Sequence, residues 1–219
     1  MHIAEGFLPP FWAIFWWLTS LPFIIYGVWK TGKIFKKHPE YKLTLAVSGA
    51  FIFVLSSLKL PSVTGSSSHP TGTGLAAVLF GPGVTALLSF IVLIFQALLL
   101  AHGGITTLGA DVFSMGIVGP FTAYLLFRAL RALKASLNIS VFIAAVISDW
   151  ITYVVTSLQL ALAYPAANGI LGSFTIFLGV FAIAQIPLAV AEGILIVIFF
   201  DYLKKSRPKL AAKLLGKLK

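Results

Sequence analysis

The first two residues, Met1 and His2, carry three nitrogen atoms that could bind one metal ion together. The free amine, the amide nitrogen of residue 2 and its imidazole are joined by short bridges, so binding through all three closes a five-membered and a six-membered chelate ring. The amide must lose its proton, which nickel(II) and copper(II) promote well and cobalt(II) less readily. Three coplanar nitrogens favour a square-planar site. The chelate requires that Met1 is retained, and a bulky second residue favours its retention.

Two further histidines lie in polar loop segments, His69 in SSSHPTGTG and His102 in HGGITTLGAD. We expect His69 to supply a fourth nitrogen to the metal. Each feature has an ordinary alternative: His102 before Gly-Gly can end a helix, Asp111 can cap the next helix, and a histidine at position 2 can be part of a solvated end. Six polar residues are expected to orient the ligands or to control access to the site: Glu5, Ser67, Ser68, Thr71, His102 and Asp111.

The composition limits the chemistry that the chain can perform. It has no cysteine, so it forms no disulfide and offers no thiolate ligand or cysteine nucleophile. Its six acidic residues are too few for a carboxylate-rich site, which favours a transition metal over magnesium or calcium. The sequence also contains no Walker A, HExxH or GxSxG motif. We therefore expect a protein that is not an enzyme and uses no catalytic cofactor, and any ATP hydrolysis must come from a partner.

Membrane helices must position these candidate ligands, because 59% of the residues are hydrophobic and only 10% are charged, against about 25% in a soluble domain. We predict one all-α integral membrane domain over 1–219, with a metal-binding segment at 1–9 and a basic cytoplasmic tail at 204–219. A transmembrane helix needs about 20 mostly apolar residues. Seven apolar runs, of which the third is short, span 10–29, 43–60, 73–81, 84–101, 112–133, 139–164 and 173–203.

The basic residues predict how the chain is oriented in the cell membrane. If all seven runs cross and the N-terminus lies outside, the inner segments contain 15 of the 16 lysines and arginines, all but Lys59. This distribution agrees with the positive-inside rule and leaves the C-terminus in the cytoplasm. It also explains the net charge of +10 without nucleic-acid binding. The short run 73–81 is expected to cross while packed against protein rather than lipid.

Two carboxylates fall inside the apolar runs, Asp149 and Glu192. Carboxylates within a membrane are costly and need partners. We expect them to form hydrogen bonds between helices, or to pair with a polar residue such as Gln185 or Gln96. A proton relay is the alternative.

Three stretches of the chain occur in the order and spacing of one protein family: MHIAEGFLP, SSSHPTGTGLAAVLFGP and QALLLAHGGITTLGADVFSMGIVGP. From residue 1 to about residue 203, the chain resembles the CbiM/NikM family, the metal-binding membrane components of energy-coupling-factor (ECF) importers for cobalt and nickel. Seven spans with an outer N-terminus fit that family. One departure is Asp111, where the family frequently has asparagine, so we do not assign this carboxylate as a ligand.

The resemblance implies a mechanism and a set of partners. The metal would be held by the Met1 amine, by the amide nitrogen and imidazole of His2, and by His69. The partners would be a transmembrane coupling protein, a pair of ATP-binding-cassette ATPases that drive import, and a small accessory membrane protein. His102 belongs to a family stretch but matches no ligand, so we expect it to support the site or to gate it.

The family resemblance and the coordination chemistry favour different metals. The AEGFLP form resembles the cobalt branch of the family, which implies a link to cobalamin biosynthesis, whereas four planar nitrogens suit nickel(II). We predict cobalt(II) uptake, with nickel(II) uptake by the same mechanism as the alternative. Two alternative functional classes are an integral membrane enzyme and a membrane component that binds a vitamin. The first would need paired carboxylates or more histidines at helical spacing, and the second an aromatic outer pocket.

Overall fold

The computed structural model describes residues 2–62 and 65–216. Five helical segments in this part are long and apolar enough to cross a membrane. The third of them combines α5 (Leu108–Asp111), the π-helical stretch η2 (Val112–Val118) and α6 (Gly119–Ala132). The chain is thus a multi-pass helical membrane protein, as its composition predicts. The five segments are α1 (Pro10–Lys37), α4 (Pro82–Leu100), Leu108–Ala132, α7 (Leu137–Ala163) and α8 (Ile170–Ser206).

Two of the seven predicted runs form helices that are shorter than an ordinary span. The run 43–60 forms α2 (Lys42–Ser57), whose 16 residues extend about 24 Å, against a hydrocarbon core of about 30 Å. The run 73–81 forms α3 (Thr73–Phe80), which has only 8 residues, all of them buried. The enclosure of α3 by protein agrees with the expectation for this run. Seven crossings and the orientation of the two termini stay predictions.

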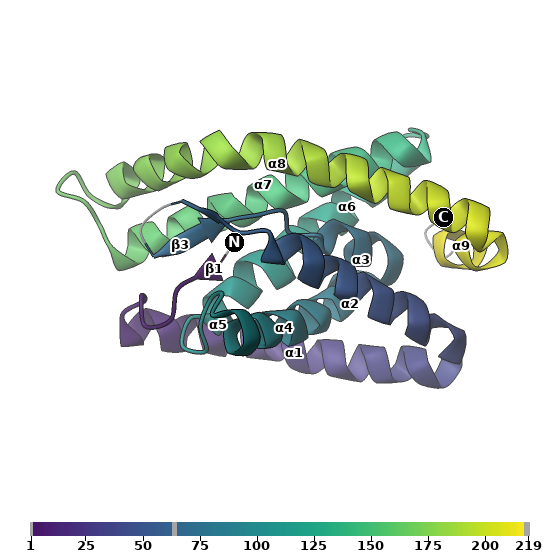
Figure 1. Cartoon of the computed structure of the whole chain (residues 1–219), viewed down its shortest axis with the longest axis horizontal. Coiled ribbons are helices and arrows are strands. Elements are labelled where there is room, and N and C mark those ends of the chain that lie inside the picture. Colours follow the sequence, from purple (N-terminus) through teal and green to yellow (C-terminus); the bar gives the residue numbers. More distant parts are fainter. Residues whose placement is uncertain (1, 63–64, 217–219) are drawn as a thin grey trace.

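The helices pack into one bundle (Figure 1). α7 packs along α8 and α6, α1 packs along α4, and the short α3 contacts α4, α6 and α7. Gly81 separates α3 from α4 with a φ of 84°, a conformation that suits glycine. Large apolar side chains such as Leu18 of α1 and Ile183 of α8 point outward. Extended apolar surfaces of this kind are typical of contact with a membrane.

A small antiparallel sheet ties the N-terminal segment to the loop that carries His69. β1 (His2–Ile3) pairs with β3 (Ser66–Ser68), and β3 also pairs with β2 (Leu60–Pro61). In Figure 1 β1 and β3 lie next to each other within the bundle. The hydropathy pattern does not predict this sheet, because strands of two or three residues are too short to show an alternating pattern.

The basic tail folds back onto the bundle in its described part. α9 (Pro208–Gly216) buries Ala211 and Leu214. An ion pair joins Lys213 of α9 to Glu40 in the turn after α1. The predicted tail at 204–219 therefore contributes to packing and is not a free extension there, while its last residues, 217–219, lie outside the described part.

Candidate metal centre

Three histidines from distant parts of the sequence meet beside the small sheet. His2 lies on β1, His69 directly follows β3, and His102 follows α4. One ring nitrogen from each lies within 4.8 Å of the other two, and all three side chains are buried. Nδ1 of His2 and Nε2 of His69 are 2.6 Å apart. The ring of His102 lies against that of His2, with centroids 3.8 Å apart. Such a cluster of imidazoles is a candidate site for a transition metal.

Two left-handed residues after α4 bring the third histidine into this cluster. Ala101 ends α4 with a φ of 46°, and Gly103 turns the chain again with a φ of 79°. A Cβ atom at Gly103 would lie 2.8 Å from Cδ2 of His2, and one at Gly104 would lie 2.4 Å from Cα of Glu5. The glycine pair therefore does more than end a helix, since it leaves room for the N-terminal segment.

Tyr153 and Gln185 fix the backbone of His69. The His69 amide donates to the Tyr153 hydroxyl at 2.8 Å, and this hydroxyl donates to the His69 carbonyl at 2.9 Å. Nε2 of Gln185 donates to the same carbonyl at 3.2 Å. Nδ1 of His69 is 2.9 Å from the Pro70 carbonyl, which can only accept, so Nδ1 carries the proton of the neutral ring. Nε2 of His69 therefore presents a lone pair toward His2.

Backbone hydrogen bonds hold the N-terminal segment against two neighbouring elements. The Ile3 amide donates to Oδ1 of Asp111 at 2.9 Å, and the Thr107 hydroxyl donates to the Ile3 carbonyl at 2.7 Å. The Ser66 hydroxyl donates to the His2 carbonyl at 3.1 Å. The position of the His2 ring thus depends on residues at the start of the third long segment and on β3.

Burial keeps the three imidazoles uncharged. Removal from water lowers the pKa of His2 well below its usual value, with His69 adding to the effect, and it does the same for the pKa of His69. Burial also lowers the pKa of His102 to about 3. All three rings are therefore neutral at pH 7, and the neutral imidazole is the form that binds metal ions.

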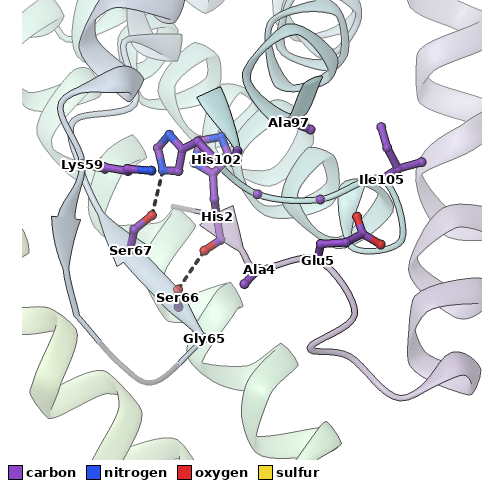
Figure 2. A pocket seen from close by; sticks show the side chains of 13 residues that line it. His2, Ala4, Glu5, Lys59, Gly65, Ser66, Ser67, Ala97, His102 and Ile105 are labelled. Carbon is purple, nitrogen blue, oxygen red and sulfur yellow. Dashed lines mark hydrogen bonds between the residues drawn. The ribbon is translucent and has the colours of Figure 1, made fainter. Parts of the chain in front are cut away.

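A surface pocket of about 550 Å³ opens beside the cluster. The Ser67 hydroxyl lies 2.9 Å from Nε2 of His102 in its wall, as Figure 2 shows. Two of the three histidines, His2 and His102, thus line the pocket. Its polar lining residues are His2, Glu5, Lys59, Ser66, Ser67 and His102.

Met1, Glu5 and Ser68 are the other residues that the sequence predicts for the site. Met1 lies outside the described residues. Glu5 is exposed beside the pocket and accepts a hydrogen bond from the Thr106 amide at 3.2 Å; hydrogen bonding to Thr106 lowers its pKa. Ser68 is buried, and its hydroxyl has no hydrogen-bond partner among the described residues. Glu5 thus anchors the loop of Thr106, and the Ser68 hydroxyl forms no hydrogen bond with an imidazole in the described part of the chain.

Both intramembrane carboxylates support the loop after His69. Glu192 accepts hydrogen bonds from the Thr71 amide and from the Thr71 hydroxyl, the latter at 3.1 Å. Asp149 accepts a hydrogen bond from Gln185, which also donates to the His69 carbonyl. The expected pairing of Asp149 with Gln185 is confirmed. Both acids therefore act in hydrogen bonding between α7, α8 and the loop, and Thr71 belongs to that support.

Sequence reasoning does not identify three residues that position this site, namely Gly103, Thr107 and Tyr153. The glycine pair after His102 is a signal, but it equally indicates the end of a helix. A tyrosine inside an apolar run is a second signal, because its buried hydroxyl must find a hydrogen-bond partner. Thr107 carries no signal of its own, since a threonine in a loop has many ordinary roles.

Known proteins resemble the chain over almost its whole length. A family model described as "CbiM: Cobalt uptake substrate-specific transmembrane region" matches residues 2–210. The chain is 63% identical over 204 residues to the cobalt transport protein CbiM of Acetoanaerobium sticklandii, covering 93% of this chain and 84% of that protein. It is 56% identical over 216 residues to the putative cobalt transport protein CbiM 1 of Methanosarcina barkeri, covering 98% and 93%.

A solved structure shares the fold. The crystal structure of a transition metal transporter matches with a TM-score of 0.82 at 26% identity, covering 94% of this chain and 93% of that chain. The family match begins at the histidine of β1 and includes all three histidines of the cluster. The chain therefore belongs to the CbiM family of cobalt uptake substrate-specific transmembrane proteins.

Proposed function

We propose that this chain is the substrate-binding membrane component of an ECF-type, ATP-driven importer and that it takes up cobalt(II). In the proposed site the Met1 amine, the amide nitrogen and Nδ1 of His2, and Nε2 of His69 hold the metal. The observation that carries the proposal is the 2.6 Å separation between Nδ1 of His2 and Nε2 of His69. The amine enters from the chelate chemistry of the first two residues, since Met1 lies outside the described part.

The short separation supports two adjacent positions on one metal ion. Metal–nitrogen bonds of about 2.0 Å that meet at a right angle place their nitrogens about 2.8 Å apart, whereas a tetrahedral angle places them about 3.3 Å apart. The separation of 2.6 Å between His2 and His69 is nearer to the first value. A right angle is the geometry of a square-planar nitrogen site, which the proposed chelate also favours.

We assign His102 to gating rather than to permanent coordination. Its ring lies 3.8 Å from that of His2, in the wall of the pocket. Its Nδ1 is buried and has no hydrogen-bond partner among the described residues. This nitrogen can receive an ion from the pocket and pass it to the inner pair of imidazoles.

Seven crossings, an outer N-terminus and a cytoplasmic C-terminus are part of the proposal. Two contacts bring basic segments together, the ion pair of Glu40 with Lys213 and the 3.3 Å hydrogen bond from Lys204 to Asn138. These contacts join the loop after α1, the first turn of α7 and the tail. Because basic loops stay in the cytoplasm, this grouping supports a cytoplasmic location for all three.

Partners are proposed to supply the energy for uptake. The sequence has no Walker A motif, so an ATPase pair must hydrolyse ATP elsewhere in the complex. A transmembrane coupling protein would transmit that energy, and a small accessory membrane protein would complete the assembly. The complex would reside in the cytoplasmic membrane of the cell, where it would reorient the metal centre toward the cytoplasm.

Metal binding by the untagged protein tests the proposal directly. Calorimetric titration in detergent should give one cobalt(II) per chain, and elemental analysis of the isolated protein should find the same metal. His2→Ala, His69→Ala and a chain with one residue added before Met1 should lose most of the affinity. His38→Ala, in the loop after α1, serves as the matched control. An extended chain that binds cobalt(II) as tightly as the native one would refute the amine chelate.

Nickel(II) is the second candidate substrate, because a right-angle arrangement of nitrogens suits it well. Competition between the two ions in the same titration compares their affinities. Uptake of each ion by cells that also contain the partners compares their transport. A preference for nickel(II) in both measurements would reassign the substrate and leave the site unchanged.

A further inference from the structure

A second surface pocket, of about 320 Å³, lies at the end of α1 and is lined by three lysines, an isoleucine and a histidine. We call it the lysine pocket, and its lining residues are Lys30, Lys33, Ile34, Lys37 and His38. We propose that it binds the phosphate headgroup of an anionic phospholipid. The proposal goes beyond metal uptake and does not depend on it.

The positive charge of the lysine pocket is not neutralised within the described part of the chain. Lys30, Lys33 and Lys37 are three and four residues apart, so they lie on one face of α1. None of these lysines forms an ion pair with an acidic side chain among the described residues. The acid nearest in sequence, Glu40, pairs with Lys213 instead. Like charges at this spacing repel each other, so an anion bound between them would relieve the repulsion.

The length of α1 places these lysines at the membrane surface. Its 28 residues extend about 42 Å, whereas the hydrocarbon core of a membrane is about 30 Å thick. Trp12 and Trp29 lie about 26 Å apart along the helix, and tryptophans are enriched at the two interfaces of a membrane. The residues that follow Trp29 therefore reach the depth of the lipid headgroups.

Lys30 is held at the start of α4. A Cβ atom at Gly81 would lie 3.2 Å from Nζ of Lys30, and one at Gly83 would lie 3.5 Å from its Cδ. α4 begins at Pro82 without a side chain that caps its first turn. Because the amide groups at the start of a helix carry partial positive charge, they add to the positive potential of the ammonium group. Two sources of positive charge thus meet at this side of the lysine pocket.

An apolar surface continues from the lysine pocket along α1. Ile25 and Trp29 precede Lys33 at intervals of four residues, and they are 60% and 54% exposed. Nζ of Lys33 lies 3.6 Å from the centroid of the Trp29 ring, so the indole joins the lysines to the apolar surface. A free phosphate ion would use the lysines alone. A phospholipid can place its headgroup on the lysines and its acyl chains along the apolar side chains, so the site is suited to a lipid.

Native mass spectrometry of the full chain in a neutral detergent tests the proposal, because it counts the lipids that stay bound. Phosphatidylglycerol should bind about tenfold more tightly than phosphatidylcholine, since each lysine near the surface attracts an anionic headgroup. The pocket variant with Lys30→Gln, Lys33→Gln and Lys37→Gln should lose this preference. A control variant with Lys36→Gln, Lys205→Gln and Lys209→Gln loses three lysines that do not line the pocket, and it should keep the preference.

Equal binding of the two lipids by the native chain would overturn the proposal, whether or not any variant folds. An equal loss of preference in the pocket variant and in the control variant would also overturn it, because the general positive charge would then attract the lipid. Displacement of phosphatidylglycerol by an equal concentration of inorganic phosphate would overturn it in favour of a free phosphate ion. Circular dichroism of both variants checks that they are folded. Cobalt(II) titration of the native chain tests the proposed function separately.

Discussion

The hydroxyl of Tyr153 bridges the backbone of His69, accepting from its amide at 2.8 Å and donating to its carbonyl at 2.9 Å. One side chain on α7 therefore fixes both polar backbone groups of the residue whose Nε2 faces His2. The carbonyl takes a second hydrogen bond from Gln185 of α8. The direction of this imidazole is thus set by the two longest neighbouring helices rather than by the loop alone.

Tyr153→Phe should weaken both stability and metal binding. The substitution removes the two hydrogen bonds to His69, and the loss of a partner for a buried polar group costs about 1–3 kcal/mol. Chemical unfolding in detergent and cobalt(II) calorimetry measure the two effects. Tyr202→Phe is the control, since its ring is 68% exposed. Equal affinity in the native and Tyr153→Phe chains would show that the loop holds His69 without this bridge.

Gly103→Ala should displace His2. A Cβ atom at this position would lie 2.8 Å from Cδ2 of His2, and the φ of 79° adds backbone strain. Gly169→Ala separates the two effects, because Gly169 has a φ of 88° and no atom within 4 Å of the added carbon. Both variants should lose some stability, but only Gly103→Ala should lose cobalt(II) affinity in calorimetry. Similar losses of affinity in both variants would contradict the steric explanation.

The three buried histidines should each contribute a fall in the free energy of unfolding as the pH is lowered below about 6.5. Histidines in the unfolded chain gain a proton near that value, whereas burial holds the pKa of His102 at about 3 and also lowers the pKa of His2 and His69. The unfolded state then binds more protons, so each buried histidine contributes a slope of up to about 1.4 kcal/mol per pH unit, which for His102 ends near pH 3.

Unfolding of the metal-free protein at a series of pH values measures this slope. His102→Phe should make it shallower, because one of the groups that is neutral only in the folded state has been removed. Equal slopes for the native and His102→Phe chains between pH 6.5 and 4 would rule out burial of a neutral His102.

Asp111→Asn should preserve the N-terminal anchor, and Asp111→Ala should not. Oδ1 of Asp111 accepts the Ile3 amide at 2.9 Å, and the oxygen of asparagine can do the same. Alanine would leave that buried amide without this acceptor, at a cost of about 1–3 kcal/mol. Thermal unfolding and cobalt(II) titration of both variants test the difference. Equal stability of the two variants would mean that the contact with Ile3 does not hold the segment.

Much of the helical framework is predictable from the sequence, since long apolar runs require helices in a membrane. The runs 139–164 and 173–203 correspond to α7 and α8 within three residues at each end. Hydropathy alone does not predict the environment of the buried α3. An apolar run of this length is compatible with a helix that crosses the membrane and with a helix enclosed by protein. The short sheet is not predictable from the sequence pattern either, because its strands form by pairing with distant residues and have no alternating pattern of their own.

The candidate site is predictable in part, because ligand chemistry draws attention to His2 and to the histidine loops. The family membership that the motifs indicate is confirmed. The position of His102 beside His2 is not predictable in this way. It depends on the left-handed residues Ala101 and Gly103, and the sequence there indicates only the end of a helix. The support by Tyr153 depends on contacts across more than 80 residues of sequence, and no local pattern encodes these.

The residues that hold the His69 loop are synthesised after the loop itself. Tyr153, Gln185 and Glu192 all lie far beyond His69 in the chain, and domains are synthesised from the N-terminus at about 5–20 residues per second. The imidazoles of His2 and His69 therefore leave the ribosome well before the side chains that hold the loop in place. An unfinished chain carries both imidazoles before the contacts with Gln185 and Glu192 can form, so the His69 loop reaches its described arrangement only once α8 has been made.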